Sequence, residues 1–219
     1  MTITPDAVQQ LLDSENFGDR IRGINQLRQL DPQIAFEMLK PLLTDPNARM
    51  RYAAVSLLDT LGGVDVTASL ELLRDRLFND SEVDVQAAAA DALGGLKLVE
   101  AFADLEQLYH QTSEWLIQLS IVATLGELGH PRGFDLLAEA LTTDNDLVVT
   151  AAISSLGELG DRRAVSLLLP FATHEDWQLR YRLAQSLGHL GGDEAQAILA
   201  KLAQDSHEQV AQEAQRNLS

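Results

Sequence analysis

The sequence predicts an all-α protein, folded as a right-handed α-solenoid of about seven helix pairs. Three observations predict this class: a Leu-Gly pair that recurs at a fixed spacing, one apolar helical stripe in each unit, and a composition rich in helix formers. Apolar residues make up 46% of the 219 residues and aromatic residues only 5%. The core must therefore consist of Leu, Ala, Val and Ile, and Ala and Leu favour helices most strongly.

The Leu-Gly pair sets the period of the chain. Its copies step by 32, 32, 31 and 31 residues: Leu61-Gly62, Leu93-Gly94, Leu125-Gly126, Leu156-Gly157 and Leu187-Gly188. The longer string LGELG stands at Leu125–Gly129 and again at Leu156–Gly160. A fixed period of this size indicates a repeat array, in which each unit packs mainly on its neighbours.

Each unit contains one strongly patterned helix, which we call its second helix. Counted back from the marker glycine, apolar residues occupy positions −9, −5, −4 and −1, as in Leu179, Leu183, Ala184 and Leu187. This spacing forms one stripe along a helix. The marker glycine is expected to let neighbouring helices approach closely, and a second glycine (Gly129, Gly160 or Gly191) suits a left-handed C-cap.

A shorter helix precedes each second helix, so every unit is predicted to be an antiparallel helix pair. The expected pairs are 5–14/17–30, 32–44/47–61, 65–79/82–96, 99–111/113–128, 131–142/145–160, 162–173/176–190 and 193–204/207–218. No linker separates them, so we expect a single array over residues 1–219. The register of the first two units stays open, because MRYAAVSLL fits the motif three residues earlier than Gly62 implies.

Composition also excludes several classes of function. The 33 acidic and 16 basic residues give a net charge of −17, which would repel nucleic acid and anionic lipid. The absence of cysteine excludes disulfides, thiolate metal sites and a covalent step on a protein thiol. There is no leader pattern and no apolar run long enough to cross a bilayer, so we expect a soluble, cytoplasmic protein without membrane insertion.

The unit that begins at Asp144 resembles a known repeat. Its residues Val148, Ala152 and Leu156–Gly160, followed by Asp161–Ala164, are similar to the short HEAT-like repeat of the phycobilisome-lyase class. The signatures of tetratricopeptide and ankyrin repeats, which have similar periods, are absent. The resemblance covers almost the whole chain. A short acidic array of this size resembles the NblB family of cyanobacterial phycobilisome degradation proteins, and also the E/F-type subunits of phycocyanobilin lyases.

The resemblance implies a partner and a ligand. The partner would be a phycobiliprotein, such as a phycocyanin or allophycocyanin subunit, and phycocyanobilin would be a ligand or substrate that is not held covalently. The chain would detach or capture this bilin during phycobilisome degradation. Two alternatives stay open: a lyase component that attaches the bilin to a phycobiliprotein cysteine, and an interaction scaffold without catalytic activity.

A second row of side chains on the second helices supplies candidate binding residues. It occupies positions −10, −7, −6 and −3, which face the concave surface of an α-solenoid. The row is apolar or small in the middle units and polar or aromatic in the outer ones, as in a groove for a helix or a planar ligand. Alternatively, curvature of the array buries these residues, or the assigned face is rotated. The candidates on or near this row are Arg51, Tyr52, Trp115, Leu116, Leu119, Leu147, Thr150, Trp177, Tyr181 and Arg182.

Single residues suggest roles within such a groove. Trp115 and Trp177 share position −11, and each could instead pack on the loop before it. Arg182 faces the open side and suits a bilin propionate, whereas Arg180 at −8 suits an ion pair with an Asp of a neighbouring repeat. Asp91 is a candidate catalytic acid near the pyrrole nitrogens of a bilin.

A metal site is not predicted. His174-Glu175 and His207-Glu208 are similar to the His-Glu pairs of di-iron HEAT-like enzymes, but there the pairs lie within the second helices. Here they lie in the loops that lead into these helices. There is no P-loop, no Rossmann glycine set and no nucleophile triad.

Overall fold

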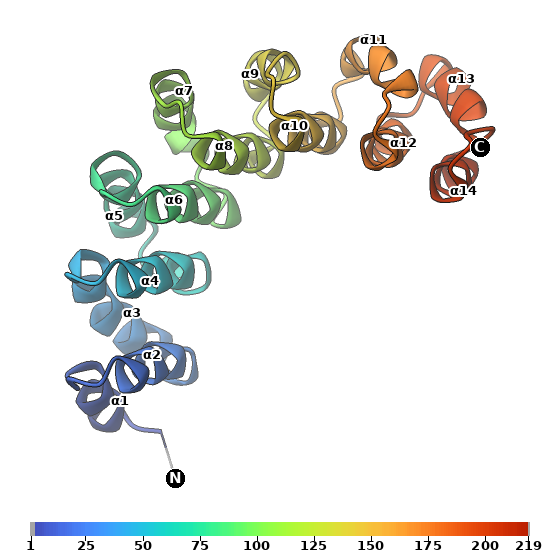
Figure 1. Ribbon diagram of the computed structural model, residues 1–219. Coiled ribbons are helices and arrows are strands. Elements are labelled where there is room, and N and C mark those ends of the chain that lie inside the picture. Colours follow the sequence, from blue (N-terminus) through green and yellow to red (C-terminus); the bar gives the residue numbers. More distant parts are fainter. Residues whose placement is uncertain (1–2, 219) are drawn as a thin grey trace. The chain divides into compact units, whose positions relative to one another are not determined.

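The protein is described by a computed structural model that covers residues 3–218 (Figure 1). Within this range every regular element is a helix, which confirms the all-α repeat prediction. The α-helices are α1 (Pro5–Leu12), α2 (Phe17–Gln26), α3 (Pro32–Leu39), α4 (Ala48–Leu61), α5 (Val66–Asn79), α6 (Val83–Gly95), α7 (Phe102–Gln111), α8 (Trp115–Leu128), α9 (Gly133–Ala140), α10 (Asp146–Leu159), α11 (Ala164–Leu168), α12 (Trp177–Leu190), α13 (Asp193–Leu202) and α14 (Glu208–Asn217). Odd-numbered helices are the first and even-numbered helices the second members of the seven pairs.

Two of the predicted first helices are shorter than expected because a proline interrupts them. The segments 32–44 and 162–173 each continue as a 3-10 helix, Lys40–Thr44 after α3 and Leu169–Thr173 after α11. Pro41 and Pro170 lack a backbone N–H and clash with the preceding turn of an α-helix. Each proline therefore ends its α-helix, and the tighter turn completes the segment.

The apolar stripe is the core of each unit. Leu179, Leu183, Ala184 and Leu187 of α12 are all fully buried, as the spacing predicted. The second glycines also behave as expected: Gly129, Gly160 and Gly191 have φ values of 61°, 72° and 62°. Gly160 adopts the left-handed helical conformation, whereas Gly191 combines a positive φ with a ψ of −171°. Positive φ values are costly for any residue with a Cβ atom.

The structure forms two compact units, residues 1–120 and 121–219, and the boundary falls inside α8. In unit 1, α4 packs on α6, and α5 packs behind α6. In unit 2, α12 lies between α10 and α14, and Figure 1 shows α9, α11 and α13 on one side of this row. The expectation of a single array over 1–219 stays a prediction.

Close helix contacts in unit 2 depend on the marker glycines. A Cβ atom on Gly157 would lie 2.7 Å from Cβ and 2.8 Å from Cα of Ser186 on the next second helix. A Cβ atom on Gly126 would lie 2.7 Å from Cβ of Ser155. Ser155 and Ser186 are 2% exposed, so they fill the space that the missing side chains leave. The marker glycine is thus a packing residue.

Ion pairs between successive repeats add a second link. Arg180 donates to both carboxylate oxygens of Asp205, at 2.7 and 2.9 Å, and to the carbonyl oxygen of His174. Arg51 holds Asp80 in the same way, with two contacts of 2.8 Å. Arg20 pairs with Asp45 through a single contact, while its Nε donates to the carbonyl oxygen of Leu12. The two-fold contacts of Arg180 and Arg51 are the parallel contacts through which a guanidinium binds a carboxylate most strongly.

The ion pairs also settle the register of the early units. Arg20, Arg51 and Arg180 each lie four residues after the cap of their helix, at Asn16, Asn47 and Asp176. The register three residues earlier than Gly62 is therefore correct for α4. In the middle repeats the position of this arginine is occupied by Gln86, Gln118 and Val149. The position of the Asp that would accept from it, two residues before the cap of the next second helix, is occupied by Thr112, Thr143 and His174. The arginine and its Asp partner are thus replaced together.

Gly157→Ala should destabilise the protein by about 1–3 kcal/mol, because the new methyl group would overlap Ser186, including its backbone. Gly63→Ala is the matched control, since a Cβ atom there meets nothing within 4 Å. Urea unfolding of both variants measures the difference. Equal stability of the two variants would contradict the close contact.

Asp205→Asn should cost roughly 3 kcal/mol at neutral pH, because it leaves the half-buried Arg180 without its carboxylate. The hydrogen bond from Arg180 lowers the pKa of Asp205, against the opposing effect of burial, and the backbone N–H of His207 adds to it. This stabilisation is complete above the ordinary pKa of Asp, about 3.9, and is lost as the pH falls through the lowered pKa. Urea unfolding from pH 7 to pH 3 should show the difference between wild type and variant shrinking, and a constant difference would argue against the ion pair.

Candidate functional site

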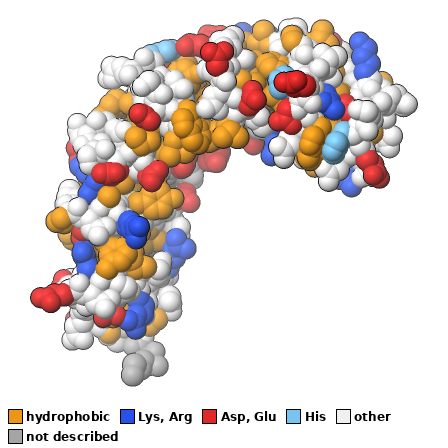
Figure 2. Space-filling view, in the orientation of Figure 1, with side chains coloured by type: hydrophobic (Ala, Val, Ile, Leu, Met, Phe, Trp, Pro, Cys, Tyr) orange, Lys and Arg blue, Asp and Glu red, His pale blue; other side chains and the backbone are white. Residues whose placement is uncertain are grey.

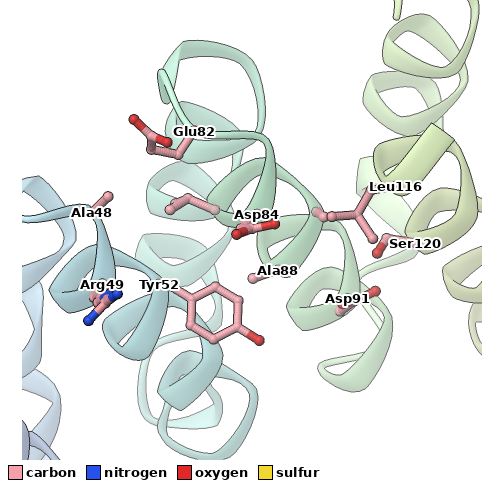
Figure 3. Close-up of a pocket in the computed structure, with 11 residues that line it drawn as sticks. Ala48, Arg49, Tyr52, Glu82, Asp84, Ala88, Asp91, Leu116 and Ser120 are labelled. Atoms are coloured by element: carbon pink, nitrogen blue, oxygen red, sulfur yellow. The ribbon is translucent and has the colours of Figure 1, made fainter. Parts of the chain in front are cut away.

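The predicted row of side chains lines a cavity in each unit. The unit 1 cavity has a volume of about 460 Å³ and lies across α4, α6 and the start of α8 (Figure 3). Its lining residues are Ala48, Arg49, Tyr52, Glu82, Asp84, Val85, Ala87, Ala88, Asp91, Leu116 and Ser120. The unit 2 cavity has a volume of about 600 Å³ and is lined by Asp146, Leu147, Thr150, Asp176, Trp177, Gln178, Tyr181, Arg182, Gln209, Gln212, Glu213 and Arg216. Both volumes are typical of ligand sites.

The unit 1 cavity combines an apolar floor with an acidic rim. Ala87 and Ala88 form the floor on α6, and Leu116 of α8 lies beside them. Tyr52 projects from α4 over this floor, and 48% of its surface is exposed. In the space-filling view, apolar side chains reach the surface in patches bordered by acidic ones (Figure 2).

The carboxyl of Asp91, in this cavity, has a raised pKa. Asp91 retains contact with solvent, but the surrounding protein displaces part of its hydration, and this raises the pKa of its carboxyl. A hydrogen bond with Ser120 of α8 opposes the rise, and the negative charge of Asp59 adds to it. Figure 3 shows the Asp91 and Ser120 side chains pointing toward each other. Ser120 thus holds the Asp91 carboxylate in place, but the net effect of the surroundings is to disfavour its ionised form.

The unit 2 cavity has an aromatic wall. The Trp177 ring stacks on the His207 ring, with 4.0 Å between centroids and 7° between planes. This contact covers one face of the indole at the start of α14 and leaves Trp177 half-buried. Tyr181 lies one turn further along α12, and its hydroxyl accepts a hydrogen bond from Gln185 at 3.3 Å. Two aromatic side chains therefore line the same wall.

Two arginines carry the positive charge of the unit 2 cavity, whose lining also contains the carboxylates of Asp146, Asp176 and Glu213. Arg182 donates to the side-chain oxygen of Gln185 at 2.9 Å and, among the described residues, forms no ion pair. Arg216 on α14 has a 3.4 Å contact with Glu213, and 72% of its side chain is exposed. Because Gln185 is neutral, it orients Arg182 without cancelling its charge. The Arg182 guanidinium is available for an added carboxylate.

The structure divides the predicted candidates between the two cavities. Tyr52, Leu116 and Asp91 line the cavity of unit 1. The cavity of unit 2 contains the larger group: Leu147, Thr150, Trp177, Tyr181 and Arg182. Leu119 is half-buried and Trp115 is 45% exposed, and neither belongs to the lining of either cavity.

The sequence predicts Arg51 as a binding residue, and the structure contradicts this. Its residue surface is only 9% exposed, and its guanidinium is fully engaged by the Asp80 carboxylate and the Asp45 carbonyl oxygen. The neighbouring Arg49, which lines the unit 1 cavity, is the exposed arginine of α4. The open register of this repeat caused the misassignment, since it obscured which arginine faces outward.

Sequence reasoning missed the contribution of α14 to the unit 2 cavity. Gln209, Gln212, Glu213 and Arg216 occupy the same four row positions as Gln178, Tyr181, Arg182 and Gln185 of α12, one period of 31 residues later. Extending the row to the last repeat would have found them.

In the part of the chain that the structure covers, no cluster of three His, Asp or Glu side chains could hold a metal, and no helix could cross a membrane.

Asp91→Asn should stabilise the protein at neutral and alkaline pH. The raised pKa means that the folded state disfavours the ionised carboxyl, so ionisation of Asp91 costs stability as the pH rises above the ordinary pKa of about 3.9. Asparagine keeps an oxygen for Ser120 and carries no charge. Urea midpoints at pH 8, 6 and 4 should show a gain that disappears toward pH 4, and a variant less stable at pH 8 would refute the assignment.

Solved structures share the fold at low sequence identity. One is the complex of CpcE and CpcF of phycocyanin lyase from Nostoc sp. PCC7120, with 18% identity and a TM-score of 0.65 over 86% of this chain and 76% of that chain. An archaeal HEAT-like repeats protein from Thermococcus onnurineus NA1 has 12% identity and a TM-score of 0.62 over 99% and 96% of the two chains. No curated protein matches the sequence.

A family model shows to which family the chain belongs. The family model for HEAT repeats matches residues 70–156 and 150–219, which together span more than half of the chain. The matched region includes α6 to α14, where the marker glycines and the apolar stripe are most regular. The chain belongs to the HEAT-repeat family.

Proposed function

We propose that this protein binds a phycobiliprotein and captures its phycocyanobilin in the unit 2 cavity, as a degradation factor of the NblB class. The bilin is a linear chain of four pyrrole-derived rings with two propionate groups. A site for it needs a flat apolar or aromatic wall and cations for the carboxylates. The single observation that carries the proposal is the presence of both features in one cavity of about 600 Å³.

Each part of the bilin has a matching group in this cavity. Trp177 and Tyr181 offer ring faces to the pyrroles, and Leu147, which is 56% exposed, offers apolar surface on the facing helix. Arg182 and Arg216 lie on adjacent helices and suit one propionate each. In a chain with 16 basic residues and 33 acidic ones, two arginines in one cavity are a specific feature.

The likeness to the CpcE and CpcF complex supports the proposal in a general way, because that complex is described as a phycocyanin lyase. It also favours a second candidate function, in which this chain is an E/F-type lyase component that attaches the bilin. Attachment forms a bond from a cysteine sulfur to a bilin carbon, and the thiol proton moves to the neighbouring carbon. Detachment breaks the same bond and returns a proton to sulfur.

The absence of cysteine restricts the part that this chain can take in either reaction. The sulfur must belong to the phycobiliprotein, so this protein would bind and orient the bilin without covalent attachment. Tighter binding of the free bilin than of the attached one would favour detachment thermodynamically. Asp91, the suggested acid, lines the other cavity, and we assign it no step in this reaction.

The binding test is a titration of the purified protein with phycocyanobilin, followed by visible absorbance. The double variant Arg182→Ala/Arg216→Ala should bind at least tenfold more weakly, a loss of about 1.4 kcal/mol or more. Arg28→Ala is the control, because Arg28 is an exposed arginine outside both cavities. No spectral change at high micromolar protein would instead favour an interaction scaffold.

A second experiment separates detachment from attachment. Wild-type protein is mixed with chromophore-bearing phycocyanin in one sample, and with chromophore-free phycocyanin plus free bilin in another. The proposal expects loss of covalently bound bilin in the first, read by fluorescence of the denatured subunits on a gel. New covalent bilin in the second sample alone would establish the lyase function in its place.

A further inference from the structure

We propose that the unit 1 cavity binds a basic segment of a partner protein, by accepting the side chain of an arginine or lysine. This site is separate from the bilin cavity and is the more acidic of the two, because its lining has one arginine against three carboxylates, where the unit 2 cavity has two against three. Its floor, its aromatic wall and its rim are supplied by α4, α6 and the first turns of α8. Each of these three parts favours a cation on an apolar stem.

The rim sets the sign of the occupant's charge. Glu82, Asp84 and Asp91 contribute three carboxylates, and Arg49 at the edge contributes one opposing charge. Asp59 adds a further negative charge near Asp91. An anionic ligand such as a bilin would be repelled here, whereas a guanidinium or ammonium group would gain charged hydrogen bonds. The overall charge of −17 would also speed the approach of a basic partner.

The aromatic wall and the floor fit the rest of a basic side chain. Tyr52 is 48% exposed and projects over the floor, so its ring face can contact a cation. Ala87, Ala88 and Leu116 provide a shallow apolar surface for the methylene stem. Arginine and lysine combine these two needs in one side chain, because their charged heads end apolar stems.

The cavity is open to solvent across three helices, so a partner segment can lie along it. A volume of about 460 Å³ also exceeds the need of one side chain, so neighbouring apolar residues of the partner segment would fill the remainder. Helical segments commonly bind in grooves of this kind.

The test is a selection of random twelve-residue peptides on the intact protein, because it assumes no partner. We expect enriched peptides to carry Arg or Lys beside apolar residues. For the best peptide, labelled for fluorescence anisotropy, the triple variant Glu82→Gln/Asp84→Asn/Asp91→Asn should weaken binding at least tenfold. Tyr52→Ala should weaken it by a similar factor, while Tyr52→Phe, which keeps the ring, should bind like wild type.

The control removes equal charge elsewhere in unit 1. Glu71→Gln/Asp6→Asn/Asp13→Asn changes three exposed carboxylates outside the cavity and should alter binding less than twofold. The proposal would be overturned by enrichment of neutral or acidic peptides, by no enrichment at all, or by equal losses of binding in both triple variants.

A further experiment tests whether the site binds a small organic cation instead. Agmatine is a free guanidinium compound, and if it binds as tightly as the best peptide, the site belongs to a small organic cation.

Discussion

The close contact between neighbouring second helices is the constraint on which the rest of the structure depends. In unit 2 it is made at Gly157, which leaves no room for a side chain against Ser186. The buried stripe of each second helix then faces its own unit and its neighbours, and most residues at −10, −7, −6 and −3 stay at least partly exposed, although Ala87 and Ala88 are buried. Three such helices side by side produce a cavity lined largely by this row, together with residues at the start of the helices such as Asp176 and Trp177.

The ion pairs explain why so few arginines are available for ligands. Arg20, Arg51 and Arg180 link successive repeats, and burial of these pairs makes them parts of the scaffold. Arg182 differs by two residues from Arg180 and has a different role, because its helix turns it toward the cavity and its partner Gln185 is neutral. Arg182 therefore lies beside two aromatic rings without an ion-pair partner among the described residues, although carboxylates line both cavities.

The sequence was sufficient to predict the fold and most of the residues in the row that lines the cavities. Period, stripe and left-handed glycines follow from local chemistry, so the helix pairs were predicted with errors mainly at Pro41 and Pro170, where a 3-10 helix replaces the α-helix. The site was predicted less well because it depends on which rows meet in space. Arg51 was misassigned because burial decides between an ion pair and a free cation, and Arg216 was missed because the last repeat lacks its marker glycine.

The most direct test of the bilin site uses the two tryptophans of the chain, one near each cavity. Each gives one indole N–H signal in a two-dimensional ¹⁵N NMR spectrum, and single Trp→Phe variants assign the signals. Addition of phycocyanobilin to the intact protein should shift the Trp177 signal strongly and leave that of Trp115 unchanged, because only Trp177 lines the cavity of unit 2. A bilin that shifts Trp115 alone, or that shifts neither signal, would contradict the site.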